Sequence, residues 1–172
     1  MIRPIAPEDE PLIAAFHGQL SERSVYFRYF HMMPLETRVA HERLARICFP
    51  DYDRVIVLVA EGRNPEGDGR EILGVARLAK QPGTNEAEFA VLVVDRVQRR
   101  GLGREMLRRL LDIARDEKLE AVYGQILPEN RAMAAVCRRL GFEVSFMHAE
   151  MLRARFKLGS STPEKQPTFT AK

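Results

Sequence analysis

The sequence has few of the residues from which disulfide bonds and metal sites are built. Its only cysteines, Cys48 and Cys137, lie far apart and form no CxxC pair, and its four histidines are isolated from one another. This pattern provides neither a disulfide framework nor the ligand spacing of a metal site. We therefore expect no metal cofactor, and we expect a protein of the cytoplasm, where thiols stay reduced.

Long hydrophobic runs are also absent. No stretch approaches the roughly 18 uninterrupted apolar residues that a membrane-spanning helix requires, and the N-terminus has no apolar run typical of a signal peptide. The formal net charge is only +3, although charged residues make up 30% of the chain. A polycation that binds nucleic acid is therefore not indicated. We expect a soluble protein with no membrane partner and no nucleic-acid partner.

What the sequence does have is enough apolar residues, 45% of 172, to build the core of one domain. Runs of β-branched residues and alternating patterns predict strands at 2–5, 55–59, 71–79, 86–94, 121–127, 143–148 and 151–158. Helical spacing of apolar residues predicts helices at 7–20, 35–48, 102–118 and 130–140. We expect one domain over residues 1–158.

Three other segments show neither period. Residues 21–34, rich in aromatic side chains, are expected to form a packed loop. Residues 62–70, with several glycines, are expected to form a turn. Residues 159–172, in which Ser, Thr, Pro and Lys dominate, are expected to form a disordered tail.

A strand followed by a glycine turn and a helix is the most informative part of the chain. Gly101 and Gly103 let the backbone turn sharply, so that free N–H groups point outward where the helix begins. Such a turn suits a phosphate or a pyrophosphate, and Arg99, Arg100 and Arg104 add positive charge. An ordinary strand–helix turn with a solvated basic rim has the same local pattern. The sequence has no Gly-Lys-Ser/Thr run, and no third glycine stands where a dinucleotide-binding turn requires one, which excludes a nucleotide P-loop and a dinucleotide fold.

Two motifs in this part of the chain carry a family resemblance. The run Gln98-Arg99-Arg100-Gly101-Leu102-Gly103 resembles the Q/R-x-x-G-x-G/A acyl-CoA signature of the GNAT superfamily of N-acetyltransferases. Asn130, followed by Ala134 and by Leu140-Gly141-Phe142, is similar to the N-x-x-A-x-x-x-Y-x-x-x-G-F pattern of the same superfamily. The two motifs stand in the family's order and together cover about residues 86–142.

The resemblance implies a fold and a cosubstrate. The fold would be a GNAT-like α/β domain, with a mixed, mainly antiparallel sheet of about seven strands flanked by about four helices. The sheet would split in a V between the strands at 86–94 and 121–127, and acetyl-CoA would lie in the split. The residues implied to bind it are Leu92, Val93, Val94, Gln98, Arg99, Arg100, Gly101, Leu102, Gly103, Arg104 and Asn130.

Upstream segments extend the resemblance to one group within the superfamily. Residues 7–11, 21–30, 51–54 and 88–93 are similar to the acetyltransferase domain of bacterial protein lysine acetyltransferases, which modify acyl-CoA synthetases. The acceptor implied is a lysine side chain of a protein, by analogy an acyl-CoA synthetase. Acetylation of a small amine and a non-catalytic acetyl-CoA-sensing role both stay open.

The chemistry of such a transfer calls for a base. A lysine amine with a pKa of about 10.4 is protonated at neutral pH, and only the free amine attacks a thioester. The free-energy cost of removing the proton at neutral pH is about 4.6 kcal/mol. By resemblance, Glu88 occupies the usual position of the family's general base, ten residues before Gln98. A solvent-facing strand residue is the alternative, and Glu86, on the same strand face, is the natural substitute. The backbone N–H of Val93 or Val94 would hold the developing oxyanion.

One position departs from the family pattern. Cys137 stands where the family usually has a tyrosine that protonates the leaving thiolate. Its thiol is either a proton donor or, at the spacing of Met133, Val136 and Leu140, part of a buried apolar face. The sequence leaves the identity of the acid open.

Overall fold

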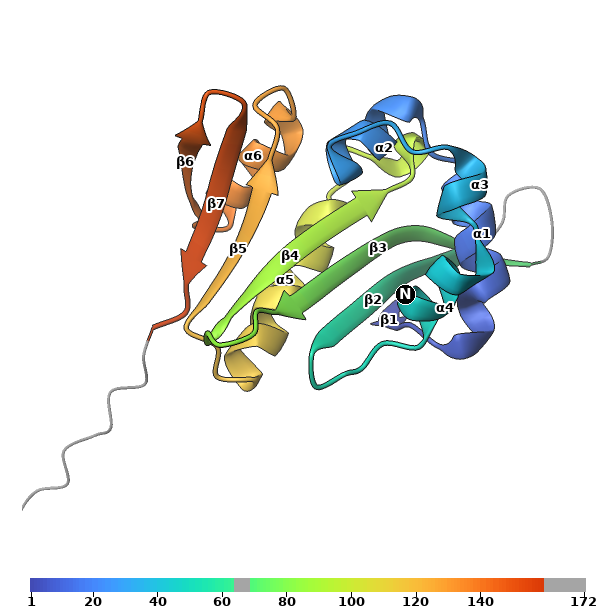
Figure 1. Cartoon of the computed structure of the whole chain (residues 1–172), viewed down its shortest axis with the longest axis horizontal. Coiled ribbons are helices and arrows are strands. Elements are labelled where there is room, and N and C mark those ends of the chain that lie inside the picture. The colour runs from blue at the N-terminus through green and yellow to red at the C-terminus, as the bar shows by residue number, and fades with distance from the viewer. Residues whose placement is uncertain (64–68, 160–172) are drawn as a thin grey trace, which may run out of the picture.

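The computed structural model describes residues 1–63 and 69–159, which form one layered α/β domain (Figure 1). The expected turn at 62–70 and the expected tail at 159–172 lie mostly outside the described residues. The strands are β1 (Ile2–Pro4), β2 (Val55–Arg63), β3 (Arg70–Lys80), β4 (Glu86–Val93), β5 (Ala121–Ile126), β6 (Glu143–His148) and β7 (Met151–Lys157). The helices are α1 (Glu10–Gly18), α2 (Glu22–Tyr29), α3 (Leu35–Arg38), α4 (His41–Cys48), α5 (Leu102–Asp116) and α6 (Arg131–Arg139), with 3₁₀ turns η1 (Pro7–Asp9) and η2 (Asp95–Val97).

The strands form one sheet in the order β1-β2-β3-β4-β5-β7-β6. All neighbouring pairs are antiparallel except β4 and β5, which run parallel. The parallel pairing joins only residues 86–88 of β4 to residues 121–123 of β5. Beyond these residues the two strands diverge (Figure 1). The mainly antiparallel, V-split sheet expected from the family resemblance is therefore confirmed.

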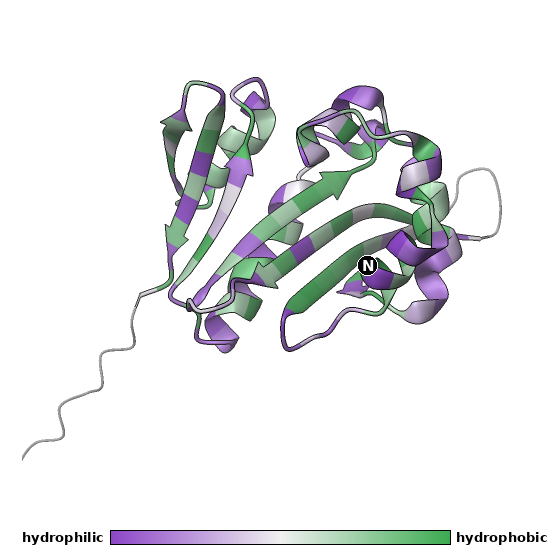
Figure 2. Ribbon diagram, in the orientation of Figure 1, coloured by the Kyte–Doolittle hydropathy of each residue, from purple (hydrophilic) through white to green (hydrophobic). Residues whose placement is uncertain are grey.

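The sheet has a hydrophobic core on each face. One core lies under α5 and α6 and includes Ala87, Phe89 and Val93 of β4. The other lies under α1, α2 and α4 and includes Leu92. Hydropathy also alternates along β7 (Figure 2), where buried Leu152 and Ala154 are separated by arginine. This period of two places alternate side chains on opposite faces of a strand.

The helices differ from the prediction in number and bounds. The described residues contain six α-helices instead of about four. Residues 22–29, expected to be part of a packed loop, form α2, which the side chain of Ser21 caps by accepting a hydrogen bond from the Ser24 amide at 3.2 Å. The apolar pattern missed α2 because Val25 is the only apolar residue of this helix that is buried.

The single helix expected at 35–48 is divided into α3 and α4. Arg38, the last residue of α3, is buried, and its guanidinium donates to the carbonyl oxygens of Met33 at 3.1 Å and His17 at 2.8 Å. The bond to His17 joins α3 to α1. The sequence pattern does not predict this division, because both acceptors of Arg38 are backbone groups and leave no mark on the choice of side chains.

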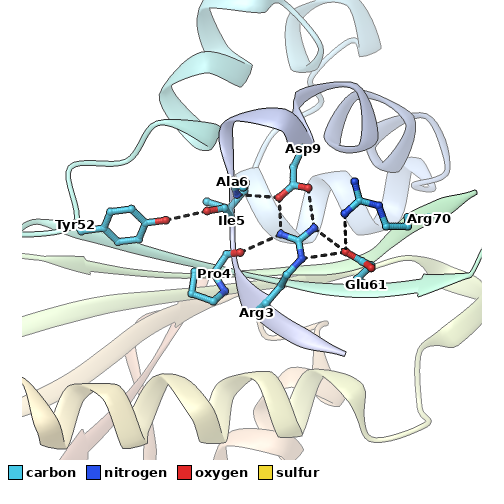
Figure 3. A network of polar contacts seen from close by, with 8 residues as sticks. All are labelled: Arg3, Pro4, Ile5, Ala6, Asp9, Tyr52, Glu61 and Arg70. Atoms are coloured by element: carbon cyan, nitrogen blue, oxygen red, sulfur yellow. Dashed lines mark hydrogen bonds and ion pairs between the residues drawn. The ribbon is translucent and has the colours of Figure 1, made fainter.

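A buried ion pair fastens the N-terminal strand to the rest of the domain (Figure 3). Both terminal nitrogens of Arg3 donate to the carboxylate of Asp9, each at 2.7 Å. Arg3 also donates to Glu61 of β2 at 2.7 Å, and Asp9 accepts from the Ala6 amide at 2.8 Å. Asp9 is 1% exposed. The hydrogen bonds from Arg3 are the main reason why the pKa of Asp9 is lowered from its ordinary value.

Replacing Asp9 with Asn tests this ion pair. We expect Asp9→Asn to lower the free energy of unfolding by about 2 kcal/mol at neutral pH, because hydrogen bonds to charged groups contribute about this much each. Urea unfolding followed by circular dichroism measures the change. Asp116→Asn, at an exposed acid of α5, is the control and should change stability by less than about 0.5 kcal/mol.

The effect of Asp9 also depends on pH. Because folding lowers the pKa of Asp9, its stabilising contribution is complete above the ordinary value of 3.8. The contribution is lost as the pH falls through the lower value of the folded state. The difference between the wild type and Asp9→Asn should therefore shrink below about pH 4. A difference that stays constant down to pH 2 would contradict the assignment.

Candidate functional site

A cleft of about 670 Å³ opens where β4 and β5 diverge. Its walls come from β4, from the turn before α5, from α6 and from α2. Of the twelve residues that the sequence analysis placed at the site, the ten that line the cleft are Glu88, Leu92, Val93, Gln98, Arg99, Arg100, Gly101, Gly103, Arg104 and Asn130. Val94 and Leu102 do not line it.

The turn before α5 presents backbone N–H groups to the cleft. Arg99 has a φ of 61° and Gly101 a φ of 88°, so two residues of this turn adopt the left-handed backbone conformation before the helix begins. Gly101 is the N-cap residue of α5, and no side chain in the described part of the chain caps this end of the helix. The amides of the first helical turn, up to Arg104, have no intrahelical acceptor. Together with three arginine side chains, they form a site suited to an anion.

The edge of β4 that faces the split carries unpaired backbone groups. The Val94 amide donates to Leu73 of β3 at 2.9 Å, and Glu86 accepts from the Gln81 amide at 2.9 Å. Because backbone groups alternate in direction along a strand, the N–H groups of Val91 and Val93 point away from β3, into the split. Val91, which the sequence analysis did not select, therefore shares this edge with Val93.

Two expected residues turn away from the cleft. Val94 is fully buried, its amide is bonded to β3, and its carbonyl oxygen accepts from Val97 at 3.1 Å. Leu102 packs against the core beneath α5. The Val94 amide is therefore not free to hold an oxyanion, which leaves Val93 of the two residues proposed for that task. Leu92 lines the cleft, but its backbone lies in the pairing with β3.

A hydrogen-bond network that the sequence analysis missed holds α2 over the cleft. Asp95 accepts from the Ser21 hydroxyl at 2.6 Å and from the Ser24 hydroxyl at 2.9 Å. Gln98 donates to Ser24 at 3.0 Å and to the Val93 carbonyl oxygen at 2.9 Å. Although burial acts to raise the pKa of Asp95, the hydrogen bonds from Ser21 and Ser24 lower it. Ser21, a preferred helix N-cap residue, was the available signal.

Glu88 stands at the last position where β4 pairs with β5. Its partner in β5 is Tyr123, and its partner in β3 is Ala79. The side chain is half-buried and lines the cleft. Among the described residues it makes no hydrogen bond or ion pair. Burial lowers the pKa of the neighbouring Arg28 guanidinium, an effect that the charge of Glu88 opposes.

Glu86, the substitute base, lies in a different setting. Its carboxylate is held by Arg155 of β7, with Arg153 at 3.8 Å. The Glu86 carboxylate is therefore already engaged in an ion pair across the sheet. Of the two acids on this face, Glu88 is the one that forms no ion pair with the described residues.

The thiol of Cys137 is fully buried in the core beneath α5 and α6. Burial raises its pKa to about 12. It does not line the cleft. The structure therefore favours the apolar role of this residue over the role of proton donor.

The oxygen and the NH₂ group of the Asn130 side chain have different surroundings. It is the N-cap residue of α6, and its side-chain oxygen accepts from the Met133 amide at 3.2 Å. Because the oxygen is engaged, the NH₂ group is the part of the side chain free for a ligand.

The described residues contain no group of three or more His, Cys, Asp and Glu side chains arranged to hold a metal ion. No helix in the same part of the chain has the length and hydrophobicity needed to cross a bilayer.

A sheet split beside a strand with free amides, followed by an amide-rich turn into a helix, defines the class of acyl-CoA-dependent N-acetyltransferases. Residues 1–143 match the family model described as the acetyltransferase (GNAT) domain. The chain is also 30% identical over 142 residues to acetyltransferase PA5475 of Pseudomonas aeruginosa, which covers 83% of this chain and 74% of that protein. The chain belongs to the GNAT family of acetyltransferases.

Solved structures agree with this assignment. The GNAT domain of PAT from S. lividans has a TM-score of 0.78 and 25% identity, over 91% of this chain and 89% of that one. The PaiA N-acetyltransferase of Thermoplasma acidophilum, solved in complex with coenzyme A, has a TM-score of 0.69 over 91% of this chain and 98% of that one. At 14% identity, the second likeness shows the fold alone.

The two glycines of the turn should respond differently to substitution. Gly101→Ala places a side chain at a φ of 88°, and we expect it to lower the free energy of unfolding by about 1–2 kcal/mol. Gly103 has an ordinary φ, and a Cβ there would meet Val93 at 3.8 Å. Gly103→Ala should leave stability unchanged or raise it by up to about 1 kcal/mol. Urea unfolding of both variants measures this, and equal losses would contradict the strained turn.

Proposed function

We propose that the chain transfers the acetyl group of acetyl-CoA to the ε-amine of a lysine in a protein. Family membership supports the acetyl transfer. The resemblance of the upstream segments to protein lysine acetyltransferases suggests the lysine, with an acyl-CoA synthetase as the target by analogy. The observation that carries the proposal is the carboxylate of Glu88, which is unpaired among the described residues and lies beside the edge of β4 at the mouth of the split.

The turn before α5 is the proposed binding site of the CoA diphosphate. The amides from Arg99 to Arg104 would donate to its oxygens, and the side chains of Arg99, Arg100 and Arg104 would offset its charge. The pantetheine arm would run along β4, bonded to the N–H and C=O groups that face the split. Asn130, on the opposite wall, would contribute its NH₂ group. Acetyl-CoA would be the cosubstrate, and the reaction would need no metal.

Glu88 would act as the general base. It would take a proton from the acceptor ammonium, so that the amine can attack the thioester carbon. The Val93 amide would donate to the carbonyl oxygen as negative charge develops there. Because Cys137 is buried away from the cleft, the thiolate of CoA would leave without a proton from this side chain.

The positive charge of the arginines near Glu88 affects which amine the site would accept. Arg28 and Arg77 line the cleft on the same side of the sheet as Glu88. A positive surrounding lowers the pKa of an amine and so assists its deprotonation. The same charges repel a polycation, which speaks against a polyamine acceptor.

CoA binding is the first test. Isothermal titration calorimetry should detect uptake of CoA, with an affinity that falls as salt is raised. Arg104→Gln should weaken binding about tenfold, the loss expected for a charged hydrogen bond to phosphate. Arg138→Gln, at an exposed arginine of α6 outside the cleft, is the control and should leave the affinity within about twofold. Absence of CoA uptake by the wild type would remove the basis of the proposal.

The second test concerns the base. Glu88→Gln should reduce acetyl transfer about a hundredfold or more, with little change in CoA affinity, because a general base contributes this much. Glu86→Gln is the matched control, since its carboxylate is already engaged by Arg155. Circular dichroism establishes that both variants fold.

The readout is incubation with acetyl-CoA and a bacterial lysate, followed by mapping of acetyl-lysine by mass spectrometry. A discrete acetylated protein that is lost with Glu88→Gln supports the proposal. Acetylated small amines without modified protein would favour a small-molecule acceptor. Tight CoA binding without any product would favour a non-catalytic acetyl-CoA-sensing role.

A further inference from the structure

A second cavity, of about 580 Å³, lies beside the cleft. It is lined by residues of α1, α2, α4 and the strands β2 to β4. These helices lie on the sheet face opposite α5 (Figure 1). Its floor is apolar and includes Ile13, Val57 and Val75. Arg28 and Arg77 line both the cavity and the cleft, so the two spaces share a wall. The volume is within the range of about 300–1,000 Å³ that small-molecule sites occupy.

The cavity is lined by an excess of positive charge. The arginines on its wall are Arg28, Arg43, Arg46 and Arg77. Among the described residues, none of these guanidinium groups forms a hydrogen bond or an ion pair. Two carboxylates, Glu42 and Asp51, also line the cavity, and Asp51 lies 3.7 Å from Arg54. Four cations against two anions leave a net attraction for an anionic ligand.

Two buried polar atoms in this wall lack a partner within the described part of the chain. They are Nδ1 of His17 and Nε of Arg43. His17 is only 3% exposed, and burial, with the charges of Arg38, Arg43 and Arg28, lowers its pKa to about 4. His17 is therefore neutral at physiological pH and offers a hydrogen bond without a charge. Buried polar atoms normally have partners, because an unpaired one costs about 1–3 kcal/mol.

The arginines are also held in position. The guanidinium groups of Arg28 and Arg43 lie over the ring of Tyr29, at 4.9 and 5.0 Å from its centroid. Contacts of this kind fix a guanidinium group without using its N–H donors. The donors therefore stay free for a planar acceptor such as a carboxylate, which they can bind in pairs.

We propose that this cavity binds a small organic carboxylate, with its anionic end on Arg28, Arg43 and Arg77 and its apolar part on the floor of the cavity. The apolar floor requires more than a bare anion, and the guanidinium groups require more than a hydrocarbon. The site is separate from the turn before α5, where the CoA diphosphate is proposed to lie. Because binding here involves no turnover, the inference does not depend on the proposed acetyl transfer.

Phenylacetate and its neutral isostere phenylacetamide are suitable probes for calorimetry on the full chain. Phenylacetate should bind, and phenylacetamide should bind at least about tenfold more weakly, because it cannot form the charged hydrogen bonds. Inorganic phosphate, which lacks the apolar part, should also bind more weakly than phenylacetate. Equal binding of phenylacetate and phenylacetamide, or tighter binding of phosphate, would overturn the proposal.

Two variants locate the site. Arg43→Gln and Arg77→Gln should each weaken phenylacetate binding about tenfold. Arg77 is exposed on β3, so its replacement should not disturb folding even if that of Arg43 does. Arg138→Gln, which changes the net charge equally but lies outside both cavities, should bind as the wild type does. Unchanged phenylacetate affinity in Arg77→Gln would rule out this cavity as the site.

Discussion

The short parallel pairing between β4 and β5 is the constraint on which the rest of this structure depends. Pairing ends after Glu88 and Tyr123. At the next position, the ring of Phe89 lies so close to Gly124 that a Cβ there would stand 2.5 Å from a ring carbon. Phe142 packs edge-on against Phe89, with centroids 5.4 Å apart. This aromatic packing fills the base of the split, so the strands separate above a solid core.

The end of pairing creates the chemistry of the cleft. An unpaired strand edge is normally a liability, because it invites association with another chain. Here the free edge is short and lies in a concave site, walled by α6 and by the turn before α5. The network of Ser21, Ser24, Asp95 and Gln98 ties α2 to the same place from a segment more than 70 residues away. The amides of Val91 and Val93 therefore point into the split and are held in a fixed position by the surrounding structure.

Local patterns and the family resemblance predicted different parts of this arrangement. Alternation located the strand at 151–158, observed as Met151–Lys157, and helical spacing located the buried face of α5. The family resemblance predicted the split and the expectation that acetyl-CoA lies in it. α2 was missed because it is held by polar groups, and the partner of Ser21 is distant in sequence. The direction of each amide on β4 needed the register with β3, which shows that Val94 bonds within the sheet.

The same end of pairing also separates two similar carboxylates. Glu86 and Glu88 lie on one face of β4, so sequence alone treats them as equivalent. Glu86 lies where β4 is still paired with β5. Arg155 of β7, which pairs with Tyr123 of β5, extends across β5 and binds the Glu86 carboxylate. Glu88 is one pleat further along, at the mouth of the split, and has no guanidinium bonded to it within the described residues. The two acids are only two residues apart, but only Glu88 lies at the point where the sheet begins to open. Glu86 therefore forms a structural ion pair, and Glu88 faces the cleft.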